Sequence, residues 1–134
     1  MRKEKLKVKI FTQWRSTSSW GWLPEVDLYV SFGARTEHTN HRLTSGAGFD
    51  KESAAVAEAI EKSKILTSLL KTRYSQAQGA PRGLYRWGST PGIEKGIGMQ
   101  EIDRILQWLG LKKVKEEKEK WYHEYIYEGE ITVV

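Results

Sequence analysis

Apolar and polar residues alternate along the first part of the chain. Over 5–13, Leu6, Val8 and Ile10 fall on one side and the intervening lysines on the other. A period of two is typical of a strand with one buried face. A second alternating stretch covers 26–34, and a polar stretch without proline covers 36–44. These patterns predict two strands, followed by a third that is exposed on one side.

Helical spacing dominates the middle of the chain. The stretch 50–73 is rich in alanine, Asp50 is placed to cap it, and a leucine and isoleucine stripe continues it. It predicts one helix. Apolar residues over 99–109 share one helical face, and Gly110 is placed to end a second helix. Between them, 79–98 is rich in glycine and proline and predicts a long loop.

The C-terminal part predicts further strands. The stretch 112–120 mixes charges of both signs and predicts a solvated turn or a polar hairpin. The stretch 121–127 predicts a strand, which 130–134 either extends or pairs with after a turn at Gly129. The pattern predicts a single α+β domain over 1–134, with a mostly antiparallel sheet of about four to five strands covered on one face by two helices.

Composition excludes several classes of protein. The 134 residues include no cysteine, which rules out thiol catalysis, disulfides and thiolate metal sites. No apolar run is long enough to cross a membrane, and the basic start lacks the apolar stretch of a secretion signal. We therefore expect a cytoplasmic protein that makes no membrane contact.

Positive charge is concentrated in two separate segments. Residues 1–15 carry six lysines and arginines against one glutamate, and 62–93 carry six against no acidic residue. If the fold brings both segments to one face, they form a basic patch of the kind that phosphate-bearing partners need. The alternative is that these side chains are ordinary solvated residues.

Cationic and aromatic side chains alternate within 82–87. Arginine can neutralise phosphates while tyrosine and tryptophan stack on bases, which is how single-stranded nucleic acid is bound. In the alternative interpretation, Leu84 and Trp87 plug this segment into the core. The leading hypothesis is a non-catalytic protein that binds single-stranded DNA or RNA. Its candidate contacts are Lys5, Lys7, Lys9, Arg15, Arg82, Tyr85, Arg86 and Trp87.

Two Gly-x-Gly turns precede the two predicted helices. Glycine lets backbone amides approach a ligand closely, and free N–H groups at a helix start favour an anion. The candidate residues for a small anion or nucleotide are Gly46, Gly48, Lys51, Gly96 and Gly98. The Gly-Lys-Ser/Thr ending of a P-loop is missing, and Asp50 would compete for the amides. Tight turns explain both segments equally well.

The sequence nominates no catalytic, metal or cofactor site. His38 and His41 would face opposite sides of a strand, which is wrong for shared metal ligation, and His123 is interpreted as a packed or surface side chain. No serine, histidine and acid arrangement is recognisable. We expect binding rather than catalysis, although an enzyme is not ruled out.

The segment 44–59 and the later glycine loop 91–98 resemble small uncharacterised proteins of bacteriophages and prophages. The shared features are Ser-Gly-x-Gly, an aromatic residue and Asp-Lys before an alanine-rich helix. The resemblance implies a small protein made in a bacterial cytoplasm and acting on nucleic acid or on a host protein. A module that inhibits a host or defence factor is therefore the alternative function, and self-association stays open.

Overall fold

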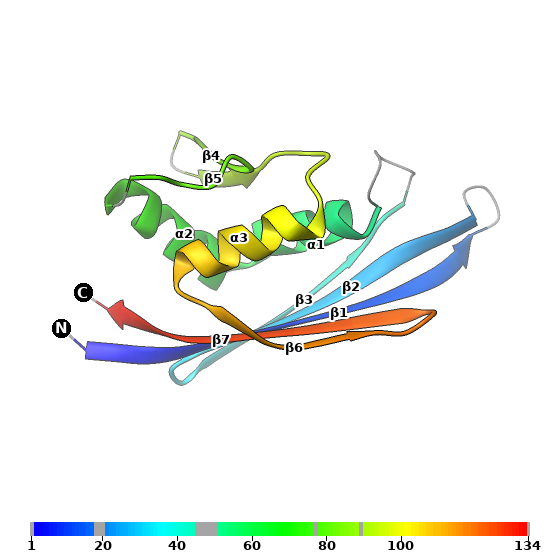
Figure 1. Ribbon diagram of the computed structural model, residues 1–134, viewed down its shortest axis with the longest axis horizontal. Coiled ribbons are helices and arrows are strands. Elements are labelled where there is room, and N and C mark those ends of the chain that lie inside the picture. The colour runs from blue at the N-terminus through cyan, green and yellow to red at the C-terminus, as the bar shows by residue number, and fades with distance from the viewer. Residues whose placement is uncertain (1, 18–20, 45–50, 77, 89, 134) are drawn as a thin grey trace.

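A five-stranded antiparallel sheet and three helices make up the fold. The computed structural model describes residues 2–17, 21–44, 51–76, 78–88 and 90–133. The sheet contains β1 (Arg2–Thr17), β2 (Gly21–Phe32), β3 (Arg35–Arg42), β6 (Lys112–Lys118) and β7 (Tyr122–Val133), in the order β3-β2-β1-β7-β6. Helices α1 (Lys51–Lys62), α2 (Lys64–Gln76) and α3 (Met99–Leu109) cover one face. A hairpin of β4 (Leu84–Trp87) and β5 (Thr90–Ile93) lies beyond the helices, away from the sheet (Figure 1). The predicted α+β class and antiparallel sheet are confirmed.

The core lies between the sheet and the helices. In the central strand β1, Val8 is fully buried and stands between Val30 of β2 and Tyr127 of β7. The lysines between the buried positions point to the other face, which no helix covers. The alternation read from the sequence therefore separates a helix-covered face from an open face.

The prediction of a single helix over 50–73 is wrong, because the helix breaks at Ser63. The Ser63 hydroxyl accepts a hydrogen bond from the backbone N–H of Leu66 at 3.1 Å and donates one to the carboxylate of Glu37 in β3. Serine in this position caps a new helix more readily than it continues an old one. The sheet is therefore covered by three helices rather than two.

Strands occur both in 79–98, predicted as a long loop, and in 112–120, predicted as a solvated turn or a polar hairpin. The stretch 79–98 contains the hairpin, held down by the buried side chains of Leu84 and Ile93. The stretch 112–120 contains the edge strand β6, where Lys115 Nζ lies 2.6 Å from Glu124 Oε1 of β7. Charged residues and a β-bulge are common on edge strands because they discourage pairing with other chains. A bulge is present between Lys113 and Lys115.

Strand β7 runs without a turn through Gly129, so 130–133 extends it. Gly129 instead serves a close approach of two backbone segments. A Cβ atom at this position would overlap the carbonyl oxygen of Gly110, which ends α3 with a φ of 113°. Of the two alternatives predicted for 130–134, extension of the strand is confirmed as far as Val133, and the glycine allows a close approach rather than a change of direction.

Candidate functional site

The structure separates the two groups of candidate nucleic-acid contacts. Lys5, Lys7 and Lys9 lie on the open face of the sheet. The segment 82–87 lies on the hairpin, with the helix layer between the two groups (Figure 1). The expected single basic patch made of both segments therefore does not form.

The cations of β1 have acidic neighbours. Lys9 Nζ lies 3.6 Å from Glu124 Oε2, and Arg15 lies 3.5 Å from Glu25 Oε1. Lys7 is directly opposite Glu128 in β7, and Lys5 is opposite Glu130. Acidic residues of the neighbouring strands therefore reduce the positive potential around these β1 cations.

Trp87 is the most exposed of the large apolar side chains described, at 83 % of its full accessibility. Leu84, by contrast, is buried and anchors the hairpin. The suggestion that both residues plug into the core thus holds for Leu84 alone. Beside Trp87, Arg86 donates through Nε to the carbonyl of Gly88 at 2.8 Å and through a terminal nitrogen to the Ser75 hydroxyl of α2 at 2.9 Å.

The Arg86 contact joins the hairpin to a basic strip on α2. Lys64 and Lys71 are exposed and two turns apart, and the Ser75 hydroxyl lies one turn further on, bonded to the carbonyl of Lys71. We call Lys64, Lys71, Ser75, Arg86 and Trp87 the α2–hairpin surface. Within the described part of the chain, its three cations form no ion pair with a carboxylate.

The other two hairpin candidates lie outside this surface. Arg82 is exposed just before β4. It precedes Gly83, where a Cβ atom would approach Glu101 and Ile97 near the start of α3. Tyr85 is half-exposed, and its ring lies against Gly92 of β5.

The two Gly-x-Gly helix starts are only partly described. Gly46 and Gly48 lie outside the described residues, and Lys51 is the first residue of α1. Gly96 has a φ of 89°, and Gly98 is the N-cap of α3 without a side-chain cap bond. The Ser53 hydroxyl of α1 donates to the carbonyl of Ile97, so the starts of α1 and α3 lie together and the two helices run in the same direction (Figure 1).

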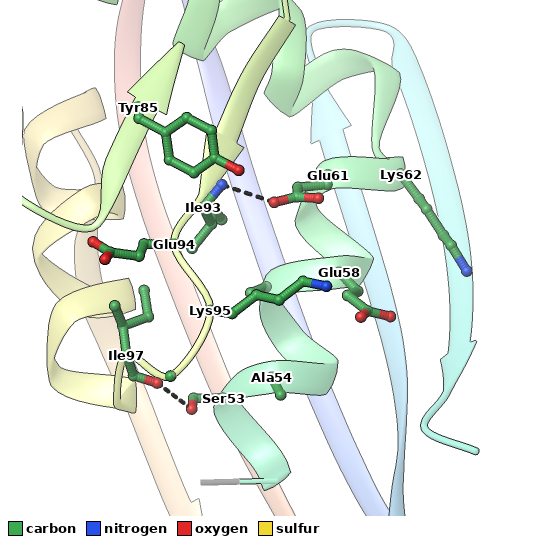
Figure 2. Close-up of a pocket in the computed structure, with 12 residues that line it drawn as sticks. Ser53, Ala54, Glu58, Glu61, Lys62, Tyr85, Ile93, Glu94, Lys95 and Ile97 are labelled. Carbon is green, nitrogen blue, oxygen red and sulfur yellow. Dashed lines mark hydrogen bonds between the residues drawn. The ribbon is translucent and has the colours of Figure 1, made fainter. Parts of the chain in front are cut away.

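A pocket of about 590 Å³ lies between α1 and the segment 93–97, with Tyr85 at one end (Figure 2). Ala54 and Ala57 of α1 and the side chains of Ile93 and Ile97 give it apolar walls. Glu58, Glu61, Glu94, Lys62 and Lys95 supply its charges.

A buried polar cluster, which the sequence reasoning missed, joins α1 to β7. The Glu52 carboxylate accepts a hydrogen bond from the Tyr125 hydroxyl at 2.9 Å and contacts His123 Nδ1 at 2.6 Å. Burial, and then the charge of Glu52, raise the pKa of Tyr125 well above its ordinary value, so the hydroxyl stays protonated and donates. His123 is thus a packed side chain with a carboxylate partner. The available signal was its place two residues before Tyr125, on the same face of one strand.

Comparison with known proteins adds no assignment: no protein-family model, curated protein or solved structure matches the chain. Among the described residues, no helix is both long and apolar enough to cross a membrane. The same residues contain no group of three or more histidine, aspartate or glutamate side chains that could hold a metal ion.

Proposed function

We propose that this chain binds single-stranded nucleic acid through the α2–hairpin surface. The observation that carries the proposal is the combination of Trp87, exposed at 83 %, with three cations from a segment that contains no acidic residue. A flat exposed ring and unpaired positive charge are the two features that single-strand binding requires. We also propose that the protein is a phage product and that it acts in the bacterial cytoplasm.

Electrostatics favours this surface over the lysine row of β1. A phosphate approaching Lys71 and Arg86 meets no ion pair within the described residues, whereas a phosphate approaching Lys9 must compete with Glu124. The hydrogen bonds of Arg86 also fix its guanidinium against Ser75 of α2, so less side-chain entropy is lost on binding. Lys5, Lys7, Lys9 and Arg15 therefore leave the proposed contact set.

The aromatic contact of the proposal is Trp87. Its ring has room for a base, and stacking of one base contributes roughly 1–3 kcal/mol. The Tyr29 ring on the open sheet face is less suitable, because His38 stacks on it at 4.4 Å and Lys9 Nζ lies 5.6 Å from its centroid. Tyr85 is a second stacking candidate with half its surface free.

The direct experiment is a fluorescence titration with a single-stranded oligonucleotide at low and moderate salt. We expect quenching of tryptophan emission and an affinity that falls by roughly 0.7 log units per log unit of salt for each phosphate contact. Trp87→Phe should remove most of the quenching, whereas Trp121→Phe at the far end of the sheet should keep it. Binding that is unaffected by salt, or quenching that survives Trp87→Phe, would refute the proposal.

A protein-binding module is the second candidate, favoured by a different surface. Trp22 and Trp121 are each about half-exposed and stack with their centroids 4.4 Å apart. Exposed tryptophans are common anchors of protein interfaces. A partner recovered from nuclease-treated bacterial lysate and lost with Trp121→Ser would favour this function over nucleic-acid binding. Recovery of the same proteins by the parent and by Trp121→Ser would count against the protein-binding function.

A further inference from the structure

The pocket beside α1 has the shape of a small-molecule site. One wall is α1, where Ala54 and Ala57 leave space that larger side chains would fill. The other wall is the segment 93–97, and the Tyr85 ring closes one end (Figure 2). A concave, mostly apolar cavity of about 590 Å³ with a few polar groups is typical of ligand sites.

The α1 wall carries two carboxylates, of which Glu61 accepts a backbone hydrogen bond and Glu58 lies close to a histidine. Glu61 Oε1 accepts the backbone N–H of Ile93 at 2.7 Å (Figure 2), and Glu58 Oε2 lies 2.6 Å from His41 Nε2. Like charges three residues apart on a helix repel each other. A cation in the pocket would relieve this repulsion and meet the Glu61 carboxylate, which its bond to Ile93 already positions.

The two lysines of the pocket differ in where their ammonium groups lie. Lys62 Nζ is 2.8 Å from His41 Nδ1, and its side chain points away from the pocket. Lys95 extends from the opposite wall toward Glu58 (Figure 2). The Lys95 ammonium group therefore points to the same side of the cavity as Glu58, but within the described residues it forms no ion pair with a carboxylate.

From these contacts we infer that the pocket binds a small organic amine, with its ammonium group beside Glu58 and Glu61 and its apolar body against Tyr85 and Ile97. The pocket contains no residue of the α2–hairpin surface and shares only Tyr85, the second stacking candidate, with the proposed nucleic-acid contacts. The pocket should prefer a cation, whereas the sequence predicted an anion site at the glycine turns. The reason is that Gly96, one of the predicted anion contacts, lines the same pocket as Glu58 and Glu61.

The test uses three ligands of one shape and different charge: tryptamine, its neutral alcohol tryptophol, and indole-3-propionate. Each is titrated into the isotopically labelled protein, and amide shifts of Ala54, Gly96 and Ile97 are followed by NMR up to about 10 mM ligand. Tryptamine should shift these amides and bind at least about tenfold more tightly than the other two. Equal or tighter binding of the propionate, or no shift with tryptamine, would overturn the inference.

Variants separate charge from shape. Glu61→Gln keeps an acceptor for Ile93 and should weaken tryptamine binding about tenfold. Glu128→Gln, on the open face of the sheet, should leave tryptamine binding unchanged. Ala54→Leu should block the cavity while all charges stay. Tryptamine binding that survives both pocket variants would show that the pocket is not an amine site.

Discussion

The carboxylate of Glu52 lies 2.6 Å from Nδ1 of His123, although 71 residues separate the two along the chain. With Tyr125, this contact fixes the first turn of α1 on β7. A buried acceptor that serves two donors is costly to remove, because both donors lose their partner.

Glu52→Ala should therefore destabilise the protein by about 1–3 kcal/mol. Glu52→Gln should cost less, because its amide oxygen can still accept from Tyr125. Urea unfolding of both variants, with the exposed Glu119→Ala as control, measures the difference. A Glu52→Ala protein as stable as the parent would show that the cluster contributes nothing to stability.

Ser63 separates α1 from α2 by capping the second helix. Ser63→Ala should cost about 0.5–2 kcal/mol, since the N–H of Leu66 and the carboxylate of Glu37 both lose a partner. Ser68→Ala, on the exposed side of the same helix, should change stability little. Thermal or urea unfolding measures the stability of both variants. Equal losses of stability in Ser63→Ala and Ser68→Ala would contradict the capping role.

His41 should make stability depend on pH. Burial first, and then the charge of Lys62, lower its pKa below the ordinary 6.5, so the unfolded chain takes up a proton more readily than the folded one. The His41 contribution to stability is present above pH 6.5 and is lost as the pH falls below it. Unfolding free energies at pH 7.5, 6.5 and 5.5 should decline less in His41→Gln than in the parent. An unfolding free energy that falls equally with pH in both proteins would contradict this prediction.

Gly129 tolerates no side chain beside Gly110. Gly129→Ala should destabilise the protein by about 1–3 kcal/mol, because the backbone of α3's end must move to make room. Thr132→Ala in the same strand serves as the control. A Gly129→Ala protein with parent stability would show that the two backbones separate without cost.

Local patterns sufficed for β1, β2, β3, β7 and α3, since each has one buried face and a regular period. The break at Ser63 could not be predicted, because it depends on Glu37, which is 26 residues away in the chain and comes close only after folding. Strand β6 was hidden for a similar reason: its charges find partners such as Glu124 only across the sheet.

The candidate site shows the same limit. Sequence could identify the cationic and aromatic residues of 82–87 but could not tell which face of the molecule they share. Arg86 proved to lie against Ser75 of α2 rather than near the lysines of β1. Of the eight candidate contacts, only Arg86 and Trp87 belong to the surface that we propose, and Lys64 and Lys71 join them because Arg86 lies against α2.

The most direct test compares two variants that remove equal charge from opposite faces: Lys64→Gln with Lys71→Gln, and Lys5→Gln with Lys7→Gln. Affinity for a single-stranded oligonucleotide is measured over a range of salt. The first variant should bind more weakly and lose about 1.4 units of salt slope, while the second keeps the parent slope. A loss confined to the β1 variant, or equal losses in both, would contradict binding through the α2–hairpin surface.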